Sequence, residues 1–295
     1  MEWHERYPEY CKMIENALPQ YLPAADGPHH IITEAMGYSL LGGGKRIRAS
    51  LLLAMCELCG GDVAEALPFA AAIEMVHAYS LIHDDLPCMD NDELRRGKPT
   101  CHVQYGEANA LLAGDALLTH AFETMAGGYF AGALPAETVL RCIHTLAKAA
   151  GAEGMIGGQV IDIEYEAKPL PAELLEQLHR MKTGALIRAS ATIGCLLAGA
   201  PEDVILQAGI YAEKIGLAFQ IVDDILDATH TSEELGKSAS DAENEKTTYI
   251  TLYGEDAARQ MVRTLVLEAD LAIKGTILDD PILYQLADAL ADREK

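Results

Sequence analysis

Two clusters of aspartates, each at the end of an apolar run, are the residues of this sequence whose types and spacing most directly suggest chemistry. They consist of Asp84, Asp85, Asp90, Asp223, Asp224 and Asp227. On a helix, Asp223 and Asp227 would share one face, one turn apart. Two carboxylates about 4 Å apart repel each other by ~4 kcal/mol at an effective dielectric of about 20. A solvated acidic helix end is one explanation of the second cluster, and a bound cation is the other, with Mg²⁺ as the oxygen-seeking candidate.

Basic residues follow the first cluster within the stretch HDDLPCMDNDELRRGKPT (83–100). Pro87 prevents a regular helical continuation, so Asp90 can return toward Asp84. The basic residues are Arg95, Arg96 and Lys98. Arginine binds phosphate in a bidentate manner and stays charged, so this mixture favours a metal-assisted diphosphate site over a salt-bridged surface loop. Two polar residues lie on the helical face that leads to Asp84, namely His77 and Ser80.

A second basic segment, LLGGGKRIRAS (40–50), places Lys45, Arg46 and Arg48 at an expected helix start. The preceding glycines would let the backbone approach an anion. The spacing differs from that of a Walker-type loop, so a flexible turn is the alternative. Further basic candidates are Lys182, beside Thr183, and Lys237.

The charge balance excludes several classes of function. The 295 residues include 22 Lys and Arg against 45 Asp and Glu, a formal net charge of −23. Such a chain is poorly suited to a run of phosphates, which argues against a nucleic-acid partner and an anionic membrane surface. The longest uncharged stretches, 124–136 and 189–201, have 13 residues each, whereas a membrane span needs about 20. The N-terminus shows no signal-peptide pattern, so we expect a cytoplasmic protein.

The seven cysteines are scattered and odd in number, which is typical of a reducing compartment. Cys56 and Cys59 form a CxxC motif on an apolar helical pattern. A zinc or redox site is one interpretation, but no second pair or nearby histidine completes a ligand set. Two small core residues are the favoured interpretation.

The elements that must position these residues are helices. Apolar residues recur every third or fourth position, and alternation of period two is almost absent. Segments such as AAAIEMVHAYSLI (70–82) are apolar nearly all round, as in the centre of a helical bundle. The sequence predicts an all-α fold with a single domain over residues 1–295. The expected helices cover 2–20, 30–41, 45–59, 64–84, 106–127, 136–150, 154–167, 171–198, 202–228, 254–274 and 281–293.

Seven segments, in this order, resemble the trans-prenyltransferases, the isoprenyl diphosphate synthases of the polyprenyl synthetase family. They are LLGGGKRIR, HAYSLIHDDLPCMDNDELRRGKPTCH, GEANALLAGDAL, GMIGGQVIDI, HRMKTGALIRAS, KIGLAFQIVDDILD and ELGK. The resemblance covers almost the whole chain and is closest to the bacterial short-chain branch, the farnesyl diphosphate synthases. It implies one large helical bundle around a central apolar cavity, usually as a homodimer. It also implies head-to-tail condensation of isopentenyl diphosphate with dimethylallyl and then geranyl diphosphate.

The resemblance assigns roles to individual residues. It implies that both aspartate clusters hold Mg²⁺, with three ions in each active site, and that these ions grip the allylic diphosphate. Residues matching contacts to the same diphosphate are Arg95, Lys182 and Lys237. Residues matching polar groups beside the developing allylic cation are Thr183 and Gln220. The isopentenyl diphosphate site would consist of Lys45, Arg48, His77 and Arg96. The residues expected to take part in catalysis are Arg95, Lys182, Thr183 and Gln220.

The resemblance also implies that product length is set by the side chains about five residues before the first aspartate, which form the floor of the cavity and are here Tyr79 and Ser80. Five helical residues rise about 7.5 Å, roughly the depth of one prenyl unit. The bulk of Tyr79 favours a product of fifteen carbons, although its ring could instead face a neighbouring helix. The segment LPCMDNDEL (86–94) also occurs in geranylgeranyl diphosphate synthases, so a product of twenty carbons is the alternative. The segment KTTYI (246–250) has Ile250 where the family often has proline, and this departure puts the geometry of Lys246 in doubt.

Two other functions match parts of the pattern. A helical metal phosphohydrolase would use the His83–Asp84 pair, but its chemistry needs several histidines on the metals and leaves Arg95 and Arg96 unexplained. A catalytically silent prenyl-diphosphate-binding subunit would share the fold. Such subunits tend to lose aspartates from one cluster, whereas both clusters are intact here.

Overall fold

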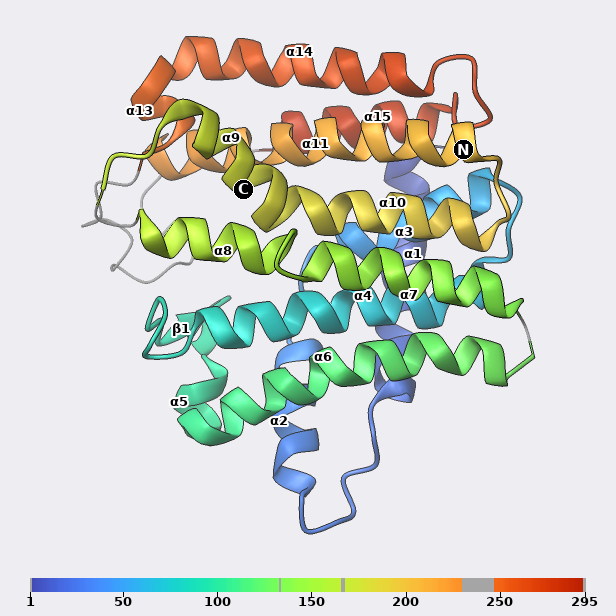
Figure 1. Cartoon of the computed structure of the whole chain (residues 1–295), viewed down its shortest axis with the longest axis vertical. Helices are drawn as coiled ribbons and strands as arrows, with labels where there is room; N and C mark the ends of the chain where they lie inside the picture. Colours follow the sequence, from blue (N-terminus) through green and yellow to red (C-terminus); the bar gives the residue numbers. More distant parts are fainter. Residues whose placement is uncertain (1, 133, 166–167, 230–246, 294–295) are drawn as a thin grey trace.

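Long helices make up almost all of the computed structural model, which describes residues 2–132, 134–165, 168–229 and 247–293 (Figure 1). In chain order the elements are α1 (Trp3–Ala17), η1 (Leu18–Tyr21), α2 (His30–Leu40), α3 (Ile47–Leu58), α4 (Val63–Asp84), β1 (Leu94–Arg95), β2 (Lys98–Pro99), α5 (Cys101–Tyr105), α6 (Glu107–Phe130), α7 (Ala136–Ala150), α8 (Met155–Glu164), α9 (Ala172–His179), η2 (Arg180–Gly184), α10 (Ala185–Leu197), α11 (Glu202–Thr229), α13 (Tyr249–Tyr253), α14 (Glu255–Ile273) and α15 (Pro281–Ala291). The predicted all-α fold is confirmed.

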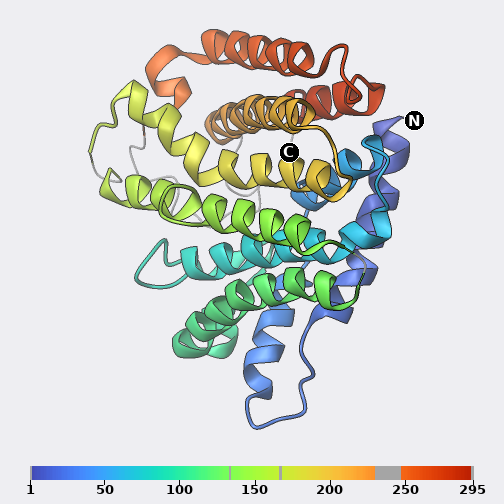
Figure 2. The same cartoon turned by 45° about the vertical axis from the view of Figure 1, so that its right-hand side comes forward.

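The long helices lie roughly side by side, with α14 and α11 toward one side and α4 and α6 toward the other (Figures 1 and 2). Helix α4 packs on α6 and α3, and α10 packs on α3, α11 and α7. Helices α4, α10 and α11 therefore form the middle of the bundle. Their ends carry the first aspartate cluster, the Lys182 segment and the second aspartate cluster.

Helix α4 is buried on nearly every side, as its continuous apolar pattern predicts. Asp62 caps its start by accepting a hydrogen bond from the N–H of Ala64 at 2.8 Å. Phe69, Ile73 and Met75 have no exposed surface. Full burial of each such side chain contributes about 2 kcal/mol of transfer free energy. This packing fixes α4 in the core and holds its polar C-terminal end at a defined place.

The helix expected over 171–198 is instead made of three segments. Helix α9 is followed by the π-helical turn η2, and α10 then continues the chain. A π-helical turn inserts extra backbone into a helix and changes which way the following side chains point. Lys182 and Thr183 lie on this turn. Apolar periodicity cannot reveal such an insertion because the pattern continues on both sides of it.

Other departures from the expected helices are smaller. The helix expected to begin at residue 45 begins at Ile47, because Arg46 has a left-handed backbone with φ of 47°. The β1–β2 hairpin and the short helices α5 and α13 had no clear periodic signal. Over the described ranges, no helix combines the length and apolar character that crossing a membrane requires.

Candidate active site

The first aspartate cluster lies where α4 ends. Asp84 is the last residue of the helix and Asp85 is its C-cap. The backbone N–H of Asp90 donates to the carbonyl oxygen of Asp84 at 2.9 Å. The chain therefore bends back after Pro87, as the sequence predicts.

Arg95 binds Asp85 directly. Its Nε donates to both carboxylate oxygens of Asp85, at 2.8 and 3.0 Å, and its Nη2 donates to Oδ1 of Asp85 at 2.5 Å. Asp92 lies 3.8 Å from the same guanidinium. The β1–β2 hairpin positions Arg95 for this contact. The expected anion-binding arginine thus holds a carboxylate of the first cluster.

Lys182 faces the first cluster from the π-helical turn. Its Nζ forms an ion pair with Asp162 of α8 at 2.6 Å. Burial opposes its charge, but Asp162, Asp84 and Asp90 outweigh that effect and raise the pKa of Lys182. Gly158 makes the approach of α8 feasible, since a Cβ there would lie 2.3 Å from the backbone nitrogen of Lys182.

Asp84 carries the most perturbed carboxylate of the first cluster. Burial raises its pKa to about 6; Asp90 and Asp85 add to the effect, and Lys182 and Arg95 oppose it. Desolvation is thus the main reason that the ionised form of Asp84 is disfavoured, and a bound cation would stabilise that form.

Thr183 and Gln220 meet across the bundle. The hydroxyl of Thr183 donates to the side-chain oxygen of Gln220, which joins η2 to α11. Two residues expected beside a developing cation are therefore in contact, although they are 37 residues apart in the chain. Oxygen dipoles so arranged can stabilise positive charge nearby.

The second cluster has three different environments. Asp223 forms an ion pair with Arg293, which follows α15. Asp224 is buried; its carboxylate accepts from the N–H of Tyr249 at 2.9 Å and lies 4.0 Å from His179. Asp227 is exposed, one turn beyond Asp223. Asp224 therefore also links α11 to α13, a contact that its sequence spacing does not indicate.

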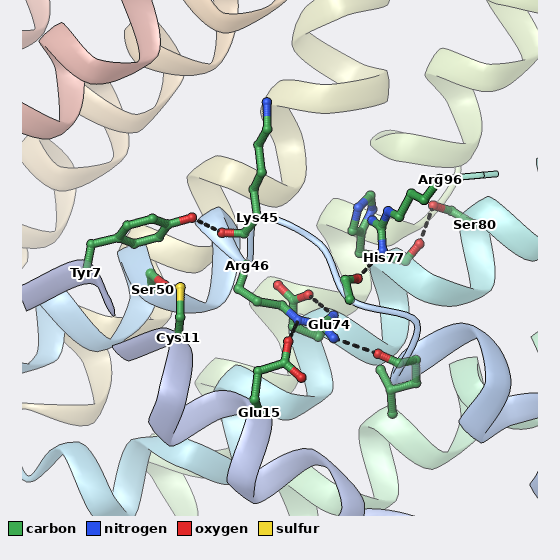
Figure 3. Close-up of polar contacts among 12 residues, drawn as sticks. Tyr7, Cys11, Glu15, Lys45, Arg46, Ser50, Glu74, His77, Ser80 and Arg96 are labelled. Carbon is green, nitrogen blue, oxygen red and sulfur yellow. Dashed lines mark hydrogen bonds and ion pairs between the residues drawn. The ribbon is translucent and has the colours of Figure 1, made fainter. Parts of the chain in front are cut away.

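Lys45, Arg48, His77 and Arg96 line one hollow of about 410 Å³. Figure 3 shows His77 and Arg96 next to each other, with Lys45 extending away from Arg46. Arg96 donates to the carbonyl oxygen of Gly43. The four residues expected to bind isopentenyl diphosphate are thus brought together. The apolar part of the lining comes from Ile47, Ile187 and Phe219.

The hollow is strongly positive. Burial, with Arg48 and Arg96 nearby, keeps the pKa of His77 well below its ordinary value, so the imidazole is neutral. The buried Nε of Arg48 has no hydrogen-bond partner among the described residues. A buried guanidinium with an unsatisfied donor is a ready site for an anion such as phosphate.

Arg46 has a different role from its neighbours Lys45 and Arg48. Its guanidinium is buried and donates to Glu15 at 2.7 Å, Glu74 at 2.9 Å and the carbonyl oxygen of Leu40 at 2.8 Å (Figure 3). These partners satisfy its donors. Arg46 therefore holds the basic loop in place, and its charge is already paired.

Tyr79 and Ser80 lie one turn before the first cluster. Tyr79 is 5% exposed, and its buried hydroxyl has no hydrogen-bond partner within the described ranges. Its ring meets that of His83 edge to face, with the ring centres 5.6 Å apart. Burial, together with Asp84, raises the pKa of Tyr79 to about 12. The hydroxyl of Ser80 donates to the carbonyl oxygen of His77 at 2.9 Å. Their role in product length stays a prediction.

The carboxylates form an all-oxygen set of the kind that binds Mg²⁺. Across the described part of the chain, no three acidic, histidine or cysteine side chains already lie close enough to hold one ion. Oxygens from a diphosphate and water would have to complete the coordination, as is usual for Mg²⁺. The metal ligands stay a prediction.

Two expected residues, Lys237 and Lys246, lie outside the described residues. Sequence reasoning did not single out Asp162 or Arg293. The motif GMIGGQVIDI contains Asp162, but nothing in the spacing indicates that it pairs with Lys182. Arg293 is far from the other motifs in the chain and gives no local signal.

Known proteins share both the sequence and the fold. The family model described as polyprenyl synthetase matches residues 29–271. The farnesyl diphosphate synthase of Bacillus subtilis (strain 168) is 43% identical over 96% of this chain and 95% of that protein. The heterodimeric geranylgeranyl pyrophosphate synthase large subunit 1, chloroplastic, of Arabidopsis thaliana is 46% identical over 96% of this chain and 76% of that protein. The apo crystal structure of an FPP/GFPP synthase from Zymomonas mobilis has a TM-score of 0.86 and 36% identity, and the match covers 97% of each chain.

Proposed function

The chain belongs to the polyprenyl synthetase family, and we propose that it is a prenyltransferase that joins isopentenyl diphosphate head to tail to dimethylallyl and then geranyl diphosphate. The observation that carries this proposal is that Lys45, Arg48, His77 and Arg96 line one common hollow. It lies next to the helices whose ends carry both aspartate clusters. One anionic substrate would occupy the hollow, and the other would lie between the clusters.

The isopentenyl diphosphate would be held by charge and by hydrogen bonds. Arg48 offers a buried donor that no described residue satisfies, and Arg96 and Lys45 add positive charge. His77, neutral at physiological pH, can donate one hydrogen bond without adding charge. Arg46 keeps this loop folded through Glu15 and Glu74. Bidentate arginine contacts also fix the orientation of the substrate, which turns an encounter of two molecules into a local reaction.

The departing diphosphate would be held at the two aspartate clusters. Bound Mg²⁺, held by carboxylates such as Asp84, Asp90, Asp223 and Asp227, would supply positive charge to the leaving group. Lys182 lies near the first aspartate cluster, and Asp162 and Asp84 stabilise its protonated, positively charged form. Arg95 orients Asp85 through its bidentate contact. This arrangement favours cleavage of the carbon–oxygen bond to an allylic cation.

The allylic cation would need dipoles nearby and little water. Thr183 and Gln220 present their linked side chains from η2 and α11. Ile187 and Phe219 supply apolar lining, and Phe219 also offers a ring face to positive charge. Excluding water protects a cation from hydrolysis. The product proton can leave to the bound diphosphate, so no protein base is required.

We propose farnesyl diphosphate as the main product. The buried ring of Tyr79, five residues before Asp84, supports a stop at fifteen carbons. A twenty-carbon product is the alternative, because a relative of similar identity is named geranylgeranyl pyrophosphate synthase.

The test is chain elongation by the purified protein with Mg²⁺, labelled isopentenyl diphosphate and each allylic starter. We expect diphosphate release and a labelled fifteen-carbon product from geranyl diphosphate. Arg48→Gln should raise the KM for isopentenyl diphosphate far more than that for geranyl diphosphate, and exposed Arg259→Gln, on α14, is its matched control. Absence of elongation by the protein alone would favour a silent subunit. Phosphate release without isopentenyl diphosphate would favour a hydrolase.

A further inference from the structure

A pair of cysteines outside the active site forms a close contact. Cys59 is the C-cap of α3, and Cys195 lies in the last turn of α10, 136 residues later in the chain. Their sulfur atoms are 3.8 Å apart. Cys59 belongs to the CxxC motif, which the proposed reaction does not use. Cys59 thus contacts a cysteine that the motif does not contain.

We propose that Cys59 and Cys195 are a modification site, which a peroxide converts to a reversible intramolecular disulfide. The thiolate of Cys59 attacks a peroxide oxygen, the O–O bond breaks, and with one proton the products are a sulfenic acid and water. The thiol of Cys195 then attacks that sulfur, the S–S bond forms, and a second water leaves with the thiol proton. In total, two thiols are oxidised and one hydrogen peroxide is reduced to two waters.

The two thiols differ in the way that these steps require. Cys59 is partly exposed, whereas Cys195 has no exposed surface. Contact with Cys195 lowers the pKa of Cys59, and the same contact together with burial raises the pKa of Cys195. An accessible thiol with a lowered pKa is the one that peroxide attacks first. Cys195 then resolves the sulfenic acid from within contact distance.

Cys56, the other member of the motif, is a poorer partner. The sulfur of Cys56 lies 3.8 Å from the carbonyl oxygen of Asp62. Gly61 packs against the same sulfur, since a Cβ at Gly61 would lie 2.6 Å from it. Burial raises the pKa of Cys56 to about 12, so it stays protonated. A metal does not explain the thiols either, since no three ligating side chains of the described residues are grouped closely enough to bind one.

The disulfide would connect two helices that both begin at the active site. Helix α3 starts directly after Lys45 and Arg46, and α10 starts directly after Lys182 and Thr183. The cysteines lie at the opposite ends of these helices. A cross-link between residues so far apart in sequence restricts the unfolded chain strongly. We therefore expect oxidation to raise the melting temperature, by on the order of 5 °C.

The test uses the full-length protein, reduced, freed of reductant and treated with hydrogen peroxide. Free thiols are then alkylated and the peptides mapped by mass spectrometry. We expect a Cys59–Cys195 cross-linked peptide, a higher melting temperature, and reversal of both by dithiothreitol. Cys88→Ser removes an exposed thiol and serves as a background that suppresses bonds between chains.

Two variants separate the steps. In Cys195→Ser, whose hydroxyl can take over the contact with the sulfur of Cys59 but cannot form a disulfide, Cys59 should stop at the sulfenic acid, which dimedone traps, and the melting temperature should not rise. Cys56→Ala is the matched control and should still form the cross-link. The proposal is wrong if the unsubstituted protein keeps Cys59 reduced, or yields Cys59 as a sulfinic acid or bonded to Cys56. It is equally wrong if the cross-link forms without a rise in melting temperature. Mapping the unsubstituted protein gives a result even if a variant fails to fold.

Discussion

Removal of the positive charge at Arg293 should lower the concentration of Mg²⁺ that the second aspartate cluster needs. Arg293 pairs with Asp223, and its guanidinium carbon lies 3.9 Å from the centre of the Phe219 ring. Its positive charge also helps to lower the pKa of Lys45, after burial. Arg293 therefore stands between the second cluster and the basic hollow. A divalent cation that binds Asp223 has to compete with it.

The size of the effect follows from exposure. The side chain of Arg293 is 12% exposed, but that of Asp223 is 34% exposed. Water screens an ion pair in which one partner is so accessible, so we assign the Arg293–Asp223 attraction a free energy of about 1 kcal/mol. Breaking a fully buried ion pair would cost more. Since about 1.4 kcal/mol corresponds to a factor of ten, 1 kcal/mol corresponds to about fivefold. Arg293→Gln should lower the half-saturating Mg²⁺ concentration by about fivefold.

The assay is a Mg²⁺ titration followed by melting temperature, without any diphosphate. Leaving out the diphosphate matters because a freed Arg293 could otherwise bind it. Each protein is compared with its own melting temperature at zero Mg²⁺, which removes differences in basal stability. Arg293→Lys keeps the positive charge, so its half-saturating Mg²⁺ concentration should stay nearer that of the parent protein. In an Asp223→Asn background, the Arg293→Gln effect should disappear. An unchanged or higher Mg²⁺ requirement in Arg293→Gln would refute the competition.

Three further outcomes follow from single side chains. Tyr79→Ala should shift products toward twenty carbons or more, seen by chromatography after dephosphorylation; an unchanged profile would remove Tyr79 as the stop. Because the pKa of Asp84 is about 6 and a metal needs its ionised form, Mg²⁺ affinity at the first cluster should fall about tenfold between pH 7 and pH 5, measured by calorimetry. Burial and Asp288 raise the pKa of Asp270 to about 6, and one of its oxygens has no hydrogen-bond partner in the described part of the chain. The charged form therefore destabilises the folded state increasingly as pH rises from about 4 to about 6. Asp270→Asn should therefore stabilise the protein by about 1 kcal/mol at pH 7, after allowance for solvent screening, and by almost nothing below pH 4 in urea unfolding.

The sequence predicts the helices well because each has to bury an apolar face. Helix α4 and the return of Asp90 toward Asp84 follow from periodicity and from Pro87. Local rules such as these act over a few residues, so a single sequence contains them. The common hollow of Arg48 and His77 was implied by the family resemblance, since no spacing rule connects segments in different helices.

The contacts that sequence alone could not give are those set by packing. The pairing of Lys182 with Asp162 depends on how closely α8 approaches η2, and Gly158 permits that approach. The burial of Asp224 against Tyr249 depends on where α13 docks. Arg293 reaches Asp223 only because α15 packs along α11. Each of these contacts requires the assembled bundle.

Backbone strain gathers where the anions are expected to bind. Among the described residues, the non-glycine residues with a left-handed backbone are Arg46, Asn91 and Arg96, with φ of 47°, 54° and 53°. Arg46 lies in the basic loop before α3, Asn91 in the segment that joins the first cluster to the β1–β2 hairpin, and Arg96 in the turn of that hairpin. Gly44, with φ of 137°, lies so close to Arg96 that a Cβ there would come within 2.8 Å of its guanidinium. Such conformations each cost on the order of 1 kcal/mol and persist only where surrounding contacts impose them. Here the contacts of Arg46 with Glu15 and Glu74 impose the conformation of the first loop, so two acidic side chains, of which Glu74 also lines the hollow, hold the hollow in the shape that a phosphate needs.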